Sequence, residues 1–135
     1  LFSQLQEKVD EGRPVFYVSG ETKVDNREDI RTTTEESENA IIVASYGTFS
    51  TGINIKNLHN IVFASPSKSK IRNLQSIGRG LRKGDRKENA VLYDIVDNLK
   101  YKSYTNFALR HFFERINIYN EEKFDFKINE IRMYK

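Results

Sequence analysis

The chain has no cysteine and no tryptophan, and only two of its 135 residues are histidines. Without cysteine there can be no disulfide bond and no thiolate metal ligand, which fits a cytoplasmic protein. His59 and His111 stand far apart with no ligand spacing around them, so we expect no metal site. No apolar run approaches the ~20 residues that a membrane-spanning helix needs, so we expect no membrane contact.

Two nucleotide-binding patterns are also missing. The sequence contains no G-x-x-x-x-G-K-S/T loop to cradle a triphosphate and no D-E-x-D/H box to hold magnesium. The opening residues 1–10 lack the features of a secretory signal, and the chain does not begin with methionine. We therefore expect a piece of a longer protein, and this piece alone cannot be a complete ATPase.

Positive charge is concentrated in one segment. Residues 68–87 hold eight Lys and Arg residues against Asp85 alone, a net charge of +7, while the whole chain carries only +3. A local basic segment on a nearly neutral domain points to a specific polyanion site. The alternative is a charged loop that only keeps the protein soluble.

The middle of this segment has the pattern of a helix. Apolar residues recur at steps of three and four from Ile71 to Leu81, which predicts one buried helical face. Arg72, Gln75, Arg79 and Arg82 share another face at offsets of 0, 3, 7 and 10. Gly78 and Gly80 each cost about 1 kcal/mol in a helix interior, a cost that suits close approach of a ligand to the backbone. Arginine forks match phosphate oxygens, although a solvated basic helix would share this pattern.

The segment 75–82 reads Q-x-x-G-R-x-x-R, and the segment 43–55 reads VASYGTFSTGINI. In these two segments the chain resembles motifs VI and V of superfamily 2 helicases, which lie on the second of two RecA-like domains. The chain also resembles the recombination helicases of T-even phages. It implies an ATP-dependent DNA helicase that unwinds or branch-migrates forks and Holliday junctions in recombination and repair, in the host cytoplasm if phage-encoded.

The resemblance also implies roles for single residues. Arg79 and Arg82 would reach the γ-phosphate as arginine fingers, and Gly52, Asn54 and Gln75 would face ATP. ATP and Mg²⁺ would be held mainly by an N-terminal RecA-like domain of the same polypeptide. The DNA backbone would contact a set of small and basic residues: Ser19, Gly20, Ser45, Thr48, Lys68 and Arg72. Arg27 matches a position where the family often has arginine, although an exposed helix arginine needs no special reason.

The apolar pattern predicts an α/β fold, a RecA-like, doubly wound and mainly parallel sheet with helices on both faces. We expect strands at 15–18, 40–44, 61–64 and 90–96. Helices are expected near 1–9, with Gly12 as its C-cap, and at 25–38, 71–82 and 101–119, with an edge strand at 123–128. The loops that begin at Ser19, Ser45 and Ser65 should meet at the carboxyl edge of the sheet. Residues 1–135 would form one domain, with 101–135 as a helical extension.

The last helix carries an aromatic stripe at Tyr104, Ala108, Phe112 and Ile116. Such a stripe is more often core than ligand site, and we interpret it as core. The alternative is that its aromatics stack on bases beside Arg110 and Arg115. Asp97, after the fourth strand, is interpreted as a helix N-cap or a surface carboxylate.

Three other functions share parts of this pattern. An RNA helicase and a restriction-enzyme motor subunit carry both motifs. A non-catalytic nucleic-acid-binding module would use only the basic segment 68–87, and it would bind DNA tightly by itself with a steep salt dependence.

Overall fold

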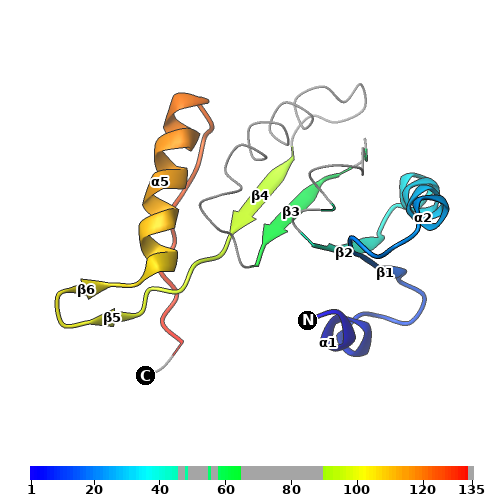
Figure 1. Cartoon of the computed structure of the whole chain (residues 1–135), viewed down its shortest axis with the longest axis horizontal. Helices are drawn as coiled ribbons and strands as arrows, with labels where there is room; N and C mark the ends of the chain where they lie inside the picture. The colour runs from blue at the N-terminus through cyan, green and yellow to red at the C-terminus, as the bar shows by residue number, and fades with distance from the viewer. Residues whose placement is uncertain (46–47, 49–54, 56–57, 65–89, 134–135) are drawn as a thin grey trace. The chain divides into compact units, whose positions relative to one another are not determined.

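The computed structural model describes residues 1–45, 48, 55, 58–64 and 90–133 (Figure 1). The chain divides into two compact units, which we describe one at a time. The first unit comprises residues 1–61 and 77–91, and the second comprises residues 62–76 and 92–135. The predicted helix at 71–82 lies outside the described residues.

The first unit is built on two short parallel strands, β1 (Val15–Val18) and β2 (Ile41–Ala44). Both segments are continuous runs of β-branched and other apolar residues, the pattern of strands in a parallel sheet. Their register pairs Val15 with Ile41 and Val18 with Ala44. Both strands lie where the sequence predicts them.

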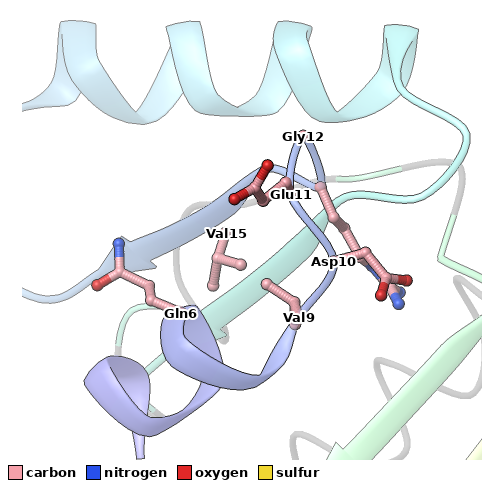
Figure 2. A pocket seen from close by; sticks show the side chains of 7 residues that line it. Gln6, Val9, Asp10, Glu11, Gly12 and Val15 are labelled. Atoms are coloured by element: carbon pink, nitrogen blue, oxygen red, sulfur yellow. The ribbon is translucent and has the colours of Figure 1, made fainter.

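One helix covers each face of the β1–β2 pair. Successive side chains of a strand point to opposite faces. The ring of Tyr17 packs against Phe2 of α1 (Phe2–Lys8) with centroids 5.5 Å apart, while Val18 is fully buried in a cluster that includes Ile30 of α2 (Val24–Glu36). Figures 1 and 2 show the two helices on either side of the strands.

The end of α1 differs from the prediction. The helix ends at Lys8, and its C-cap is Val9 in an extended conformation rather than Gly12. Gly12 instead lies in the turn before β1 with φ of +91°, a region that glycine adopts without steric cost. The glycine therefore serves the turn into the strand.

The core of the first unit lies between α2 and the strands. Val18 and Ile55 are buried together, and Ile30, Ile42, Ala44 and Leu58 pack against them. Thr34 is also buried, and its hydroxyl donates a hydrogen bond to the Ile30 carbonyl at 2.6 Å. Val24 is exposed in the first turn of α2.

A second strand pair consists of β3 (Asn60–Phe63) and β4 (Val91–Asp94). The Val91 amide donates to the His59 carbonyl at 2.9 Å, and the Ile95 amide donates to the Phe63 carbonyl at 3.1 Å. Both bonds advance in the same direction along the two strands, which is the pattern of a parallel pair. β3 begins one residue before the predicted segment 61–64 and has the same length, and β4 is shorter than the predicted segment 90–96 but lies within it.

The predicted helix at 101–119 begins later than expected. Residues before it form a hairpin of β5 (Lys100–Tyr101) and β6 (Tyr104–Thr105), and the helix α5 runs only from Phe107 to Glu121. Lys102 has φ of +55° in the two-residue turn, a conformation that such turns require. Tyrosine and threonine favour strands over helices, which explains why local preference overrides the helical spacing here.

The aromatic stripe is only partly core. Phe112 and Tyr119 are buried, and Leu109 lies with them, but Tyr104 is 81% exposed and Phe107 is 72% exposed. The interpretation of the stripe as core is therefore wrong for Tyr104, which belongs to the hairpin rather than to the helix.

The predicted edge strand at 123–128 is absent, because residues 122–133 form neither strand nor helix. The alternating phenylalanines of this segment pack against α5 instead. The rings of Phe124 and Phe126 pack on Tyr119 of α5 with centroids 6.2 Å and 6.0 Å away.

Candidate functional site

Four of the predicted site residues lie within the described part of the chain, and all four belong to the first unit: Ser19, Gly20, Ser45 and Thr48. The other predicted site residues lie outside the described part: Gly52, Asn54, Lys68, Arg72, Gln75, Arg79 and Arg82. Ser65, the third predicted loop position, also lies outside the described residues.

The register of β1 and β2 brings Ser19 and Ser45 to one edge of the strand pair. Val18 and Ala44 are register partners, and each serine is the next residue along its strand. The Ser45 amide donates to the Val18 carbonyl at 3.1 Å, so the ladder extends to the start of both loops. Parallel strands place their following loops at the same edge, where α/β folds bind ligands. The predicted convergence is confirmed for these two loops.

Hydrogen bonds fix the loop after β1 as a tight turn around Ser19. The Ser19 amide donates to the Thr22 hydroxyl at 3.0 Å, and the Thr22 amide donates to the Ser19 carbonyl at 3.1 Å. The Ser19 hydroxyl accepts a hydrogen bond from the Glu21 amide at 3.3 Å. Its own proton can therefore still be donated outward, for example to a phosphate oxygen.

Gly20 leaves open space at the tip of this turn. It is exposed, and a Cβ built on it would meet nothing within 4 Å. Its φ is not among the positive values, so backbone conformation does not require glycine here. The missing side chain leaves room for another backbone, which fits a position beside a nucleic-acid strand.

Arg27 of α2 holds the turn from the other side. One of its terminal nitrogens donates to the Gly20 carbonyl at 2.9 Å and to the Ser19 carbonyl at 3.3 Å. Its Nε is buried without a hydrogen-bond partner. Sequence reasoning treated Arg27 as an ordinary helix arginine, although the family position was a usable signal. The structure instead places it as the side chain that fixes the Ser19–Gly20 turn.

The loop after β2 contains a pair of hydroxyl groups. Ser45 Oγ and Thr48 Oγ1 lie 2.7 Å apart, and the Thr48 amide donates to the Ser45 carbonyl at 3.1 Å. Ser45 is exposed, whereas Thr48 is only 3% exposed. When Thr48 donates its proton to Ser45, the Ser45 hydroxyl is left with a proton for an external acceptor.

One arginine of α2 forms ion pairs away from this edge. Arg31 forms ion pairs with Glu28 and Glu35, one turn before and after it on the helix. The hydrogen bond from Arg31 lowers the pKa of the Glu28 carboxyl below its usual value. These pairs lie on the helix surface and take no part in the two loops.

The second unit contains a buried polar cluster of Asp94, Arg115 and Tyr119. Arg115 donates from Nε and Nη2 to the two carboxylate oxygens of Asp94 at 2.7 Å and 2.8 Å, and the Tyr119 hydroxyl donates to Asp94 at 2.7 Å. Burial, followed by the hydrogen bond to Asp94, raises the pKa of Tyr119 well above its usual range. This cluster ties α5 to the end of β4. The Arg115 side chain is buried within the second unit, so it does not stack on bases.

Asp97 is not a helix N-cap. The N-cap of α5 is Asn106, whose side-chain amide donates to the Asp97 carbonyl at 2.9 Å. Asp97 itself is exposed, as expected of a surface carboxylate. Among the described residues no group of three His, Asp or Glu side chains could hold a metal ion.

A shallow pocket of about 220 Å³ lies at the start of β1, between the strand, α1 and the turn that joins them (Figure 2). This is smaller than the ~300–1,000 Å³ that small-molecule sites usually occupy. It also lies at the opposite end of β1 from Ser19, so it is not part of the candidate site. The residues labelled in the figure are Gln6, Val9, Asp10, Glu11, Gly12 and Val15.

Comparison with known proteins gives a family and one relative. Residues 2–84 match the family described as helicase conserved C-terminal domain. The chain is 40% identical to a protein named ATP-dependent DNA helicase uvsW, from Enterobacteria phage T4. That alignment has 143 positions and covers 98% of this chain but only 28% of the relative. No solved structure gives a significant match.

The matched range includes both sequence motifs and both loops of the candidate site. None of the helices in the described ranges has the length and apolar character to cross a membrane. Since the family match extends over more than half of the residues, the chain belongs to the helicase conserved C-terminal domain family.

Proposed function

We propose that this chain is the C-terminal motor domain of an ATP-dependent DNA helicase. The observation that carries the proposal is the 40% identity to a phage T4 DNA helicase, which extends over 98% of this chain. The chain spans 28% of the length of that relative. In this proposal the activity belongs to a longer protein, in which an N-terminal RecA-like domain completes the motor. In this proposal residues 1–135 form one domain on a doubly wound RecA-like sheet with helices on both faces, and 101–135 extend it.

The first site of this motor is the loop edge at β1 and β2. The turned-out Ser19 and Ser45 hydroxyls and the open space at Gly20 suit the phosphates of a passing strand. We assign the outer contact to Ser45 and the support of its hydroxyl to the buried Thr48. Lys68 and Arg72 would add charged contacts to the same backbone. Contacts of this kind position a strand without reading its sequence.

The second site is the nucleotide site. ATP and Mg²⁺ would be held mainly by the N-terminal domain, and the donors on this chain suit a triphosphate because guanidinium and amide N–H groups match phosphate oxygens. Arg79 and Arg82 would stabilise charge on the γ-phosphate, while Gln75, Gly52 and Asn54 would face the nucleotide. Since the arginines and the phosphate loop lie on different domains, domain closure and hydrolysis become coupled.

The full-length protein tests this proposal on labelled forked, four-way and linear DNA, with an RNA duplex of matched length. We expect strand separation or branch migration of the forked and four-way substrates with ATP and Mg²⁺, and none with a non-hydrolysable analogue. Faster unwinding of the RNA duplex would favour an RNA helicase. Tight DNA binding without any ATP-dependent product would contradict the motor and favour a passive binding module.

A further inference from the structure

The segment that leads into α5 combines aromatic and basic residues and has no acid. Residues 98–113 contain three Lys or Arg residues, five Phe or Tyr residues and no Asp or Glu. Interleaved aromatic and basic residues are typical of surfaces that bind single-stranded nucleic acid. The composition alone also fits a core helix, so the exposure of the side chains decides between the two.

Two of the aromatic rings at the base of α5 are among the most exposed in the described chain. Tyr104 is 81% exposed and Phe107 is 72% exposed, although burying such a ring would stabilise the fold. They are three residues apart, one on β6 and the other at the first position of α5. Figure 1 shows the hairpin and the start of the helix side by side.

A cation accompanies these rings. The Arg110 guanidinium lies over the Phe107 ring, 4.3 Å from its centroid, and Arg110 is exposed. A guanidinium stacked on a ring keeps its N–H groups directed sideways in its own plane, where they can meet phosphate oxygens. Phe107 therefore presents an exposed aromatic side chain next to a guanidinium that can donate to a phosphate. We name Tyr104, Phe107 and Arg110 the aromatic platform.

The aromatic platform stands on rigid elements. The hairpin closes with a two-residue turn at Lys102 and Ser103, and its strands pair Tyr101 with Tyr104. The Asn106 side chain bonds the Asp97 carbonyl, and the buried Arg115–Asp94 pair fixes α5. Because the backbone that carries these side chains is already fixed, less ordering is needed when they meet a ligand, and more of the contact energy appears as affinity.

We propose that the aromatic platform is a second DNA contact of the motor, on which the bases of an unpaired strand stack. The proposal rests on DNA being the substrate, as above, and adds a base-stacking site to the backbone contacts at the β1–β2 edge. A protein partner fits less well, because the exposed Arg110 guanidinium beside an aromatic ring matches a polyanion with bases. Stacking accepts any base, so this site would not select sequence.

The test measures binding of labelled oligo-dT, oligo-rU and a blunt duplex to the full-length protein. Tyr104→Ala, Phe107→Ala and the double variant are compared with Tyr93→Ala. Tyr93 is a half-exposed tyrosine on β4 and lies outside residues 98–113. Each platform variant should weaken oligo-dT binding by about 5- to 150-fold, the range for losing one base stack. Duplex binding should change less than twofold, and Tyr93→Ala should bind oligo-dT like the unchanged protein.

Replacement by leucine separates stacking from apolar docking. Phe107→Leu keeps an apolar side chain but removes the aromatic face, so it should lose oligo-dT affinity almost as Phe107→Ala does. Phe107→Trp should restore it. As a second measurement, photocrosslinking of an iodouracil-substituted oligonucleotide should label the peptide that contains Tyr104 or Phe107.

The outcomes distinguish this inference from the proposed function. If the protein unwinds forks but the platform variants bind oligo-dT normally, the inference is wrong and the motor stands. If the variants lose oligo-dT binding in a protein that does not use ATP, the inference holds and the motor fails. Unchanged oligo-dT binding with Phe107→Leu would overturn the stacking proposal, because an apolar contact without an aromatic face would then be sufficient. A loss confined to oligo-rU would overturn the assignment to DNA.

Discussion

The β1–β2 edge and the base of α5 are both exposed, but they are built from opposite chemistry. At the β1–β2 edge the side chains are small, and hydrogen bonds of hydroxyl groups hold the two loops. At the base of α5 large rings are exposed, and a buried ion pair elsewhere in the same unit fixes the helix that carries them. Small hydroxyl residues suit phosphates, and rings suit bases. If both proposals hold, one chain provides both kinds of nucleic-acid contact from separate elements.

The largest expected effect is on the support of α5. Arg115→Ala would leave the Asp94 carboxylate buried without its partner, which costs about 3–5 kcal/mol of stability in such pairs. Hydrogen exchange of the α5 amides in the full-length protein measures this loss. Glu121→Ala, an exposed position on the same helix, is the control. If the α5 amides of Arg115→Ala exchange hydrogen at the same rates as those of Glu121→Ala, the Arg115–Asp94 ion pair does not anchor the helix.

Tyr119→Phe tests the same buried cluster of Asp94, Arg115 and Tyr119, with a smaller expected loss of stability. It removes one hydrogen bond to a charged group, worth about 1.5–3 kcal/mol at neutral pH. The pKa of Tyr119 is raised in the folded protein. Above a pH of about 10, the Tyr119 hydroxyl therefore loses its proton in the unfolded chain but keeps it in the folded protein. Stability from this group is therefore present below pH 10 and is lost as the pH rises further. The difference between the two proteins in urea unfolding should narrow above pH 10, and a difference independent of pH would argue against the hydrogen bond.

The β1–β2 edge is tested by Arg27→Ala. The variant removes two hydrogen bonds to the carbonyls of the Ser19–Gly20 turn, for which we expect about 1–2 kcal/mol of local stability to be lost. DNA affinity should fall with it, because the turn no longer holds its shape. Arg31→Ala, on the next turn of α2, should leave DNA binding unchanged. Equal DNA affinity for Arg27→Ala and Arg31→Ala would show that Arg27 does not contribute to DNA binding at the β1–β2 edge.

The smallest expected effect separates two neighbouring hydroxyl groups. Ser45→Ala removes the proposed phosphate contact, and Thr48→Val removes only its buried support. We expect Ser45→Ala to weaken DNA binding by about 5- to 10-fold, near 1 kcal/mol, and Thr48→Val by less. Titrations of labelled DNA against both variants measure this order. The reverse order would assign the outer contact to Thr48.

The strands of the first unit could be predicted because each is a short apolar run bounded by polar loops. The runs at 15–18 and 41–44 specify strands buried on both faces, and parallel pairing then places Ser19 and Ser45 at one edge. The family resemblance supplied the roles of these residues. It also gave a signal for Arg27, whose purpose became clear only from the carbonyls that it contacts.

The second unit was harder to predict because its contacts join distant residues. Asp94 lies 21 residues before Arg115 and 25 before Tyr119. The residues next to Asp94 in the strand give no signal that its partners lie so far along the chain. The helical spacing of the aromatics also concealed the hairpin at 100–105, whose Lys-Ser turn lacks the usual Asn-Gly signal. Tyr104 was therefore assigned to a buried face that it does not share.

The most direct test of the motor is ATP turnover by the full-length protein with Arg79→Ala, with Arg132→Ala as an exposed control. Arginine fingers contribute about 10³- to 10⁵-fold to phosphoryl transfer, so DNA-stimulated turnover should fall by at least a thousandfold. DNA binding should stay within a few-fold of the unchanged protein, and Arg132→Ala should retain full turnover. Turnover that survives Arg79→Ala with DNA still bound would contradict the assignment of this arginine to the nucleotide.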